Sequence, residues 1–147
     1  MKQKRTKIMV FGTFDGLHKG HINFFKQAKK LARGSFLIVS IARDINVKKI
    51  KGEKPRLNEK KRVLLVKKSK LADRVVLSSV KNYLPHVVKE GPDIIALGYD
   101  QKAYVKNLKK DLKNKGFLGH RARIVRLKPY KEKIYKNHLL NRKNILK

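Results

Sequence analysis

The sequence predicts an α/β protein: a Rossmann-like, doubly wound parallel sheet of five strands with helices on both faces. Three observations predict this class. Short β-branched and apolar runs alternate along the chain with stretches of helical periodicity. Strands that alternate with helices form right-handed βαβ crossovers, which build a parallel sheet. The length of 147 residues suits one domain, so we expect a single domain over residues 1–147.

The expected strands are short apolar runs, as is typical of strands covered on both faces. We expect them at residues 8–11, 36–41, 74–77, 94–97 and 122–127. In open sheets of this kind, ligands bind beyond the carboxyl ends of the strands, near the point where the strand order reverses. Site residues should therefore directly follow strands.

The expected helices carry local start and stop signals. We expect them at residues 21–32, 59–69, 83–90, 102–115 and 137–146. Gly34 supplies a C-terminal glycine signal after the first helix, and Asn58 is suited to be the N-cap of the second. Gly91-Pro92 separates the third helix from the strand that follows it.

The charge of the chain is extreme for its length. Forty Lys and Arg residues face ten Asp and Glu residues, which gives a formal net charge of +30. Such a charge attracts polyanions over long distances. The basic residues are spread along the whole chain and no aromatic-rich recognition motif accompanies them. We therefore expect non-specific retention of RNA rather than a specific nucleic-acid site.

The composition also limits the setting of the protein. There is no cysteine, which excludes disulfides and thiolate metal sites. The apolar run near the amino terminus is interrupted at Gly12 and is too short for a secretory signal. No segment approaches the roughly 20 apolar residues that span a bilayer. We expect a cytoplasmic protein with no membrane span.

The most informative segment is Phe11-Gly12-Thr13-Phe14-Asp15-Gly16-Leu17-His18-Lys19-Gly20-His21, which joins the first expected strand to the first helix. The first backbone N–H groups of a helix are unpaired and attract phosphate. The glycines of the segment are expected to let a triphosphate approach the backbone. The two imidazoles can donate hydrogen bonds to phosphate oxygens that gain charge during transfer. The alternative is a pair of histidines that only caps a helix.

A second candidate segment, Gly98-Tyr99-Asp100-Gln101, follows the expected strand at 94–97. A glycine at the strand end lets a base or a phosphate approach, and Asp100 and Gln101 can read substrate edges by hydrogen bonds. The alternative is a turn with Asp100 as a helix N-cap. Both candidate segments follow strands, so they can meet at one site.

A lysine-rich stretch follows the second expected strand. Lys48, Lys49 and Lys51 can reach the phosphates of two bound substrates and offset their repulsion. With this many basic residues in the chain, each lysine can equally be a solvated surface residue. Arg62 falls within the expected helix at 59–69, and one interpretation is that it is a surface arginine on that helix.

These segments resemble the nucleotidyltransferase superfamily with the His-x-Gly-His motif after a Gly-x-Phe-Asp turn. Ala42-Arg43-Asp44 with the lysine-rich stretch, and Ala96-Leu97 before the Gly-Tyr-Asp-Gln segment, are similar to archaeal-type FAD synthases within the cytidylyltransferase-like group. The resemblance covers roughly residues 7–127. It implies catalytic roles for His18, His21 and Lys49. Glu59-Lys60-Lys61-Arg62 is similar to the family's Glu-x-x-Arg helix start, which implies that Arg62 supports the bound triphosphate or the loop that covers it. It implies nucleotide contacts from Gly12, Thr13, Phe14, Gly20, Arg62, Gly98, Asp100, Asn137 and His138, and contacts to the second substrate from Asp15, Lys51, Tyr99 and Gln101.

The resemblance implies that a C-terminal helix at about residues 136–146 completes the nucleotide site. Related enzymes carry an arginine and small hydroxyl residues at the start of this helix, where this chain has Asn137 and His138. Asn remains a good N-cap, and a histidine can hydrogen-bond a phosphate. Their larger side chains can also crowd the triphosphate, so a weakened or altered activity is one expectation.

The implied reaction is nucleotidyl transfer, in which an acceptor phosphate attacks the α-phosphorus of a nucleoside triphosphate and pyrophosphate leaves. Positioning and charge stabilisation supply the rate. The favoured pair is FMN with ATP, and the alternative is glycerol 3-phosphate with CTP. Phe14, Tyr99 and Tyr104 are candidates to line a slot for a flavin ring. Mg²⁺ is expected on the triphosphate, with no metal held by the protein alone.

Two further expectations concern other functions and assembly. From another functional class, a relative that binds nucleotide or RNA without turnover also fits the net charge and the altered tail. The intact pair His18 and His21 argues against that reading. Folds of this kind often pair, so a homodimer is a further expectation.

Overall fold

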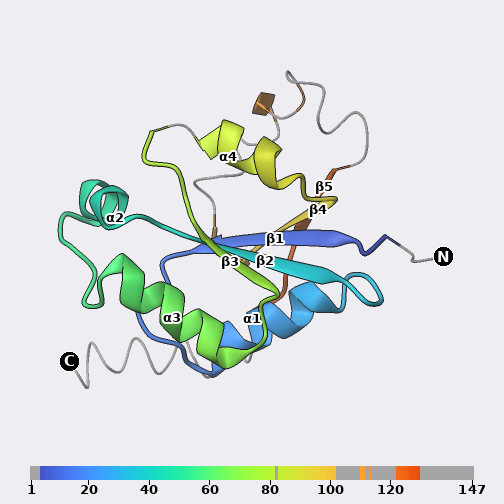
Figure 1. Ribbon diagram of the computed structural model, residues 1–147, viewed down its shortest axis with the longest axis horizontal. Helices are drawn as coiled ribbons and strands as arrows, with labels where there is room; N and C mark the ends of the chain where they lie inside the picture. The colour runs from blue at the N-terminus through green and yellow to red at the C-terminus, as the bar shows by residue number, and fades with distance from the viewer. Residues whose placement is uncertain (1–3, 82, 102–109, 112, 114–121, 130–147) are drawn as a thin grey trace.

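The structure is a computed structural model, which describes residues 4–81, 83–101, 110–111, 113 and 122–129; the structural statements below concern these residues. Five parallel strands form one sheet in the order β3-β2-β1-β4-β5 (Figure 1). They are β1 (Lys7–Gly12), β2 (Phe36–Ile41), β3 (Arg74–Leu77), β4 (Ile94–Leu97) and β5 (Arg123–Arg126). The chain runs outward from β1 to β3 and returns to β4, so the strand order reverses beside β1. The predicted fold class is confirmed.

The strands pair in register around β1. β1 pairs with β2 along its whole length, from Lys7 opposite Phe36 to Gly12 opposite Ile41. Its pairing with β4 is shorter and is confined to two residue pairs near its start. The carboxyl ends of β1 and β4 are therefore not paired with each other, and the segments that follow the two strands lie beyond these ends.

In the described part of the chain, four helices with assigned bounds accompany the sheet: α1 (Lys19–Lys29), α2 (Asp44–Lys51), α3 (Glu59–Ser69) and α4 (Tyr83–Glu90). Successive residues of a strand point to opposite faces. Ile8 and Val10 of β1 belong to a buried cluster that includes residues of α1 and α3. Met9 and Phe11 belong to a second cluster that includes residues of α4. Figure 1 shows α1 and α3 on one face of the sheet and α4 on the other.

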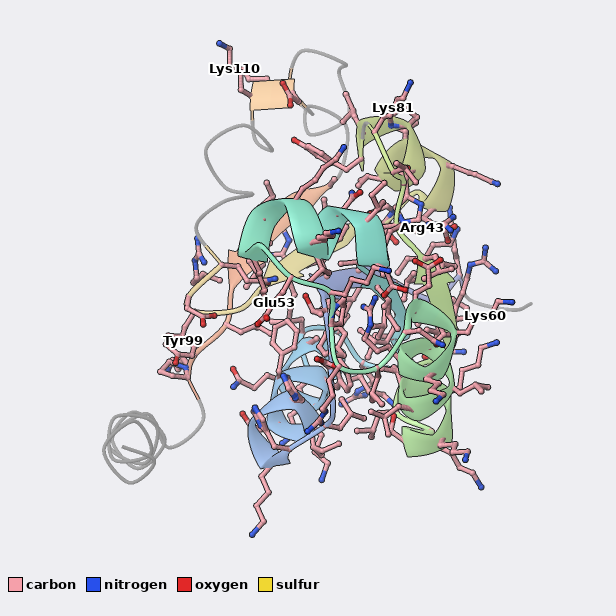
Figure 2. All side chains as sticks on the ribbon, turned by 90° about the vertical axis from the view of Figure 1, so that its left-hand side faces the viewer. Arg43, Glu53, Lys60, Lys81, Tyr99 and Lys110 are labelled. Atoms are coloured by element: carbon pink, nitrogen blue, oxygen red, sulfur yellow. The ribbon has the colours of Figure 1, made fainter. Side chains whose placement is uncertain are left out.

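The remaining helix, α2, covers neither face. Figure 1 places it beyond the carboxyl ends of the strands, and Figure 2 looks directly at that edge. In the second view α2 crosses the middle of the edge, with Tyr99 to one side and Lys60 of α3 to the other. The helix is thus placed where ligands bind in sheets of this type.

The bounds of three elements differ from the sequence-based expectations. α1 spans Lys19–Lys29 rather than 21–32. Its end was placed too late because Leu31 and Ala32, which lie in the turn after the helix, also pack against the core and so extend the apolar pattern. β1 is one residue longer at each end than expected, and β5 is one residue shorter at each end. The other strands, α3 and α4 have the predicted bounds, and Asn58 caps α3 by accepting from the Lys61 N–H at 2.9 Å.

The sequence did not predict α2. Of its apolar residues only Val47 is buried, while Ile45 and Ile50 are 51% and 78% exposed. The segment therefore has no buried apolar stripe from which a helix could be predicted. Arg43 at its N-cap makes no side-chain cap bond. Gly52 ends the helix with a φ of 86°, a conformation that favours glycine.

Two predicted helices fall mainly outside the described residues. The expected helix at 102–115 is described only at Lys110, Asp111 and Lys113, which are helical. The expected helix at 137–146 lies outside the described residues, as does Tyr104. None of the helices in the described part of the chain is long and apolar enough to cross a membrane.

Candidate active site

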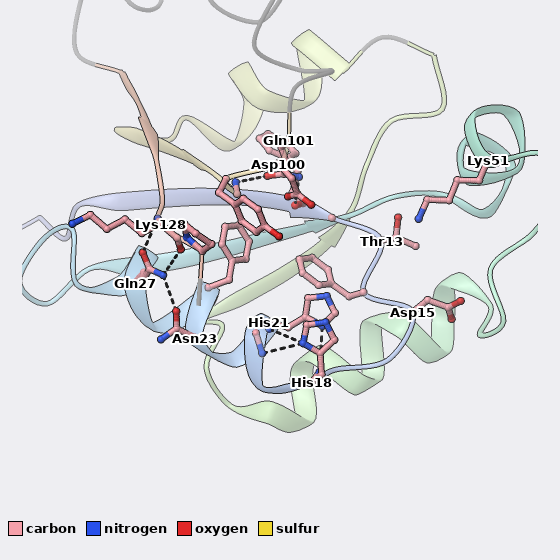
Figure 3. A pocket seen from close by; sticks show the side chains of 18 residues that line it. Thr13, Asp15, His18, His21, Asn23, Gln27, Lys51, Asp100, Gln101 and Lys128 are labelled. Atoms are coloured by element: carbon pink, nitrogen blue, oxygen red, sulfur yellow. Dashed lines mark hydrogen bonds between the residues drawn. The ribbon is translucent and has the colours of Figure 1, made fainter. Parts of the chain in front are cut away.

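Two cavities open at the carboxyl edge of the sheet. The first cavity, of about 700 Å³, lies between the turn after β1, α1, the turn after β4 and the residues after β5 (Figure 3). The second cavity, of about 390 Å³, lies between the turn after β1, α2 and the segment after β3. The two cavities share Gly12, Thr13, Lys51 and Gln101. They are therefore two compartments of one site.

The first cavity brings most of the predicted site residues together. It is lined by Gly12, Thr13, Phe14, Asp15, His18, Gly20, His21, Lys51, Gly98, Tyr99, Asp100 and Gln101. Asn137 and His138 lie outside the described residues, so their predicted nucleotide contacts stay predictions. Lys49 and Arg62 line neither described cavity.

The two motif histidines form the N-terminal cap of α1. The Nδ1 atom of His18 accepts hydrogen bonds from the N–H groups of Gly20, at 2.9 Å, and His21, at 3.3 Å. The Nδ1 atom of His21 in turn accepts from the His18 N–H at 3.3 Å. The expectation that these first helix N–H groups are unpaired was wrong. The two histidines therefore cap the helix, and their predicted contacts with phosphate stay a prediction.

This cap fixes the protonation of both rings. A nitrogen that accepts a hydrogen bond carries no proton, so the proton of each neutral imidazole is on Nε2. The rings stack with centroids 3.8 Å apart. Burial lowers the pKa of His18. Burial, and then the nearby His18, lowers the pKa of His21 to about 4. At neutral pH both side chains are therefore neutral and can donate through Nε2.

The Phe14 ring packs against this pair. It is 5% exposed, and its ring meets the His21 ring edge-on with centroids 5.4 Å apart. A Cβ atom on Gly12 would lie 2.5 Å from the Phe14 ring, and one on Gly20 would lie 2.7 Å from the His18 ring. The space at these two glycines is occupied by the chain's own rings. These two glycines are therefore needed for the packing of Phe14 and His18, and their predicted contact with a triphosphate stays a prediction.

Asp15 fastens the turn after β1 to the segment before α3. Its carboxylate accepts from the N–H groups of Arg56, at 2.6 Å, and Leu57, at 2.7 Å. Burial raises the pKa of Asp15, but these two N–H groups outweigh it and hold the pKa below its usual value. Figure 3 shows the carboxylate directed away from the histidines. Of the roles expected for Asp15, orienting the turn is the one that this geometry supports.

Arg62 is a buried brace and not a surface residue. Its side chain is fully buried and donates to the carbonyl oxygens of Leu57, Thr13 and Ala42 at 2.8–3.0 Å. It also pairs with Asp44 at 2.6 Å. A guanidinium with these partners holds the ends of β1 and β2 together. The expected direct contact to a triphosphate is not supported by this position, because Arg62 does not reach the cavity wall.

Gln101 also joins strands. Its Oε1 accepts from the Gly98 N–H at 2.7 Å, and its Nε2 donates to the Phe11 carbonyl at 2.9 Å. Arg126 donates to the carbonyl oxygens of Gly98 and Gln101 at 2.7 and 2.8 Å. Each end of the Gln101 amide thus makes a hydrogen bond to backbone, which is a structural role that the sequence did not predict, and its predicted contact with the substrate stays a prediction. Asp100 is exposed and remains available at the cavity rim.

The sequence reasoning missed the far end of the first cavity. Gln27 pairs its amide with the backbone of Lys128: Nε2 donates to the carbonyl at 2.7 Å, and Oε1 accepts from the N–H at 3.0 Å. Gln27 also donates to Asn23 at 2.7 Å. The spacing of Asn23 and Gln27 on one helix face was a usable signal. Nothing local in the sequence places the other residues found here, which are Phe24, Lys128 and Pro129.

The comparisons with known proteins decide the family. The sequence profile described as Cytidylyltransferase-like matches residues 9–138. The chain belongs to this family. An FAD synthase of Korarchaeum cryptofilum is 43% identical over 128 residues, which are 86% of this chain and 84% of the relative. An FAD synthase of Thermoplasma acidophilum is 36% identical over 137 residues, 93% of this chain and 92% of the relative.

A solved structure agrees with this assignment. The lipopolysaccharide core biosynthesis protein from Thermoplasma volcanium superposes with a TM-score of 0.76 at 36% identity, covering 87% of this chain and 100% of that one. This cytidylyltransferase-like chain is a nucleotidyltransferase, and the resemblance stated from its motifs is confirmed.

The family's lysine-rich segment forms α2. Lys51 lines both cavities, and Figure 3 shows its side chain extending toward Thr13. Lys49 is exposed and lines neither cavity. Of the two lysines chosen from the sequence, Lys51 is therefore the one positioned for substrate phosphates, and the catalytic role expected for Lys49 has no support in its position.

Carboxylates are scarce at this site. The described residues contain no group of three or more His, Asp or Glu side chains that could hold a metal ion. The Asp15 carboxylate is engaged with backbone N–H groups, which leaves Asp100 as the carboxylate at the cavity rim. A divalent ion that arrives on a triphosphate fits this arrangement, because phosphate oxygens and water supply most of its ligands.

Proposed function

We propose that this nucleotidyltransferase is an FMN adenylyltransferase, which makes FAD and pyrophosphate from FMN and ATP. A phosphate oxygen of FMN forms a bond to the α-phosphorus of ATP as the bond from that phosphorus to the pyrophosphate oxygen breaks. The observation that carries the proposal is the apolar second cavity, which adjoins the histidine cavity and suits a flat ring. The FAD synthases among the relatives support the same acceptor.

The first cavity suits ATP. The Nε2–H groups of His18 and His21 can donate to the α- and β-phosphate oxygens, where charge develops during transfer. Both rings stay neutral at neutral pH, so each keeps its donor without a change of protonation. The FMN phosphate is already anionic, so the attacking oxygen needs no general base. Positioning and charge stabilisation then supply the rate.

The second cavity suits the ring of FMN. Its wall is formed largely by apolar groups, which are Ala42, Val47, Ile50 and the ring of Tyr83. A flat apolar ring gains free energy from leaving water in such a place, whereas glycerol 3-phosphate has no apolar part to bury. Lys51 borders both cavities, where its ammonium can offset the repulsion between the phosphates of the two substrates.

Mg²⁺ completes the proposal as the ion bound to ATP. When bound, it offsets the negative charge of the triphosphate and of the departing pyrophosphate. Asp100 at the rim is the described carboxylate that can hold a water of such an ion. The protein's own contribution is the pair of neutral histidine donors and the charge of Lys51.

The test is product formation with defined substrate pairs. The purified chain is incubated with Mg²⁺, one of ATP or CTP, and one of FMN or glycerol 3-phosphate, and pyrophosphate release and FAD are measured. We expect turnover with ATP and FMN. Turnover confined to CTP with glycerol 3-phosphate would replace the proposed acceptor and base. Nucleotide binding without turnover of any pair would favour the non-catalytic alternative.

A further inference from the structure

Asn46 of α2 uses only one end of its side-chain amide. Its Nδ2 donates to the Ser79 carbonyl at 3.2 Å, which assigns the orientation of the amide. Its Oδ1 is buried and accepts no hydrogen bond, and among the described residues it is the only buried side-chain polar atom without a partner. A single exception of this kind in an otherwise satisfied structure calls for an explanation.

A buried acceptor without a partner is unfavourable, because it has lost its hydrogen bonds to water and gained none in return. A donor on a bound ligand would remove this penalty. Asn46 lines the second cavity, so a ligand in that cavity lies against the residue that needs the donor. The unsatisfied atom therefore indicates where a ligand N–H group is recognised.

The same cavity also contains a hydroxyl group that can change partner. The Ser78 hydroxyl makes only a 3.5 Å contact with the Ser79 carbonyl, at the limit of a hydrogen bond. It can turn to donate to a ligand carbonyl instead. The cavity thus combines one acceptor and one donor with an otherwise largely apolar wall.

The backbone around these two groups is held in place before a ligand arrives. Arg43 donates from Nε to the Ser78 carbonyl at 2.8 Å and pairs with Glu59 at 3.2 Å. Asn46 itself bonds the next carbonyl, that of Ser79. The segment after β3 is therefore tied to the first turn of α2, and the donor and acceptor are presented by a fixed frame.

We propose that Asn46 determines acceptor specificity by accepting, through Oδ1, a hydrogen bond from the ring N3–H of the flavin. This inference rests on the proposed function. The oxidised ring system of FMN has a single ring N–H, N3–H, and it lies between two carbonyl groups. An edge with a donor beside acceptors complements the Asn46 acceptor and the Ser78 donor. The apolar remainder of the ring complements the rest of the cavity.

The experiment compares FMN with 3-methyl-FMN, which lacks the N–H, in FAD formation by the wild type and by Asn46→Leu. Leucine has nearly the shape of asparagine but no acceptor. We expect the wild type to prefer FMN by at least about tenfold in kcat/KM, the discrimination typical of a lost buried hydrogen bond. In Asn46→Leu the preference for FMN over 3-methyl-FMN should disappear, because loss of the bond to the Ser79 carbonyl affects both flavins alike and only FMN loses a hydrogen bond to Oδ1.

The alternatives give different results. If the methyl group is rejected only by its size, Asn46→Leu will keep its discrimination between the two flavins, which overturns the inference. If Asn46 reads adenine instead, the variant will lose discrimination between ATP and N6,N6-dimethyl-ATP and keep that between the flavins. Equal use of both flavins by the wild type also overturns it, independently of any variant.

A matched control and a second variant complete the design. Asn23→Leu makes the same change on α1 at the wall of the first cavity, and it should leave the ratio of the two flavins unchanged. If Asn46→Leu does not fold, Asn46→Ala replaces it with the same expected loss of the preference for FMN. Absence of FAD from the wild type with FMN and ATP would overturn the proposed function itself, which separates that failure from failure of the Asn46 inference.

Discussion

The two turns that border the first cavity use their polar side chains in different ways. After β1, His18 and His21 satisfy backbone N–H groups through Nδ1 and keep Nε2–H for donation. After β4, each end of the Gln101 amide makes a hydrogen bond to a backbone group and so joins the ends of two strands. An imidazole has its two nitrogens on different sides of the ring, so one residue can serve structure and chemistry together. Substitutions at the two turns can separate these two uses.

The largest effect should come from removing chemistry while keeping structure. In His18→Asn the new side chain can still cap α1, because asparagine is among the best N-cap residues, but the Nε2 donor is lost. Loss of one such donor to a transition-state oxyanion typically lowers kcat by about 100- to 1000-fold. The measurement is kcat for pyrophosphate release, alongside the urea midpoint.

The comparison variant is His18→Ala, which loses both the donor and the cap. We expect it to lose the same activity and, in addition, about 1 kcal/mol of unfolding free energy. Retention of wild-type kcat by His18→Asn would mean that the histidine only caps the helix.

The opposite outcome is expected at the β4 turn. Gln101→Leu leaves the Gly98 N–H and the Phe11 carbonyl without their partner, which should lower the free energy of unfolding by about 2 kcal/mol. Urea denaturation measures this loss. Asp100→Asn, one residue away and exposed, is the matched control and should change stability by less than about 0.5 kcal/mol. Equal stability of Gln101→Leu and wild type would contradict the assigned role.

The fold was predictable because periodicity and punctuation agree along the chain. β-branched runs located every strand, and Asn58 marked the start of α3. α2 escaped because it stands off the sheet edge with one buried side chain, so it has no amphipathic pattern to detect. The end of α1 was misplaced because Leu31 and Ala32 pack on the core without being helical.

The site was predictable in its membership and not in its bonding. Sequence spacing identified His18, His21 and Asp100 as neighbours across two turns, since the carboxyl ends of adjacent strands meet. It could not show that Gln101 bridges strands or that Arg62 is buried, because those roles depend on contacts with residues far along the chain. The orphan acceptor of Asn46 is likewise visible only once α2 is in place.

A smaller effect should distinguish two lysines on α2. Lys51→Ala should lower kcat/KM for FMN by about tenfold, because Lys51 lines both cavities and, in the proposed function, its exposed ammonium offsets the repulsion between the substrate phosphates. Lys49→Ala makes the same change in charge two residues away, on a side chain that lines neither cavity, and should change kcat/KM by less than about twofold. Equal losses of kcat/KM in the two variants would show that substrate binding depends only on the overall positive charge of the protein. In that case kcat/KM of both variants would depend on salt concentration in the same way.

The smallest effect concerns the pH dependence of stability at the histidine turn. Burial first, and then the nearby His18, lowers the pKa of His21 from 6.5 to about 4 on folding. Between these values the unfolded chain binds more protons than the folded chain, so the free energy of unfolding rises with pH. The contribution is complete above about pH 6.5 and is lost as the pH falls through about 4. Protonation at Nδ1 also removes the acceptor of the His18 N–H.

Between pH 4.5 and 6.5 the pKa change alone corresponds to about 2 kcal/mol of unfolding free energy, and we expect about half of this because the ring is partly exposed to solvent. In His21→Asn the rise in unfolding free energy over this pH range, measured by urea unfolding, should therefore be smaller by about 1 kcal/mol. Some slope should remain, because burial also lowers the pKa of His86. An unchanged slope would mean that His21 titrates alike in the folded and unfolded chains, and that the turn is open to water rather than closed by its own rings.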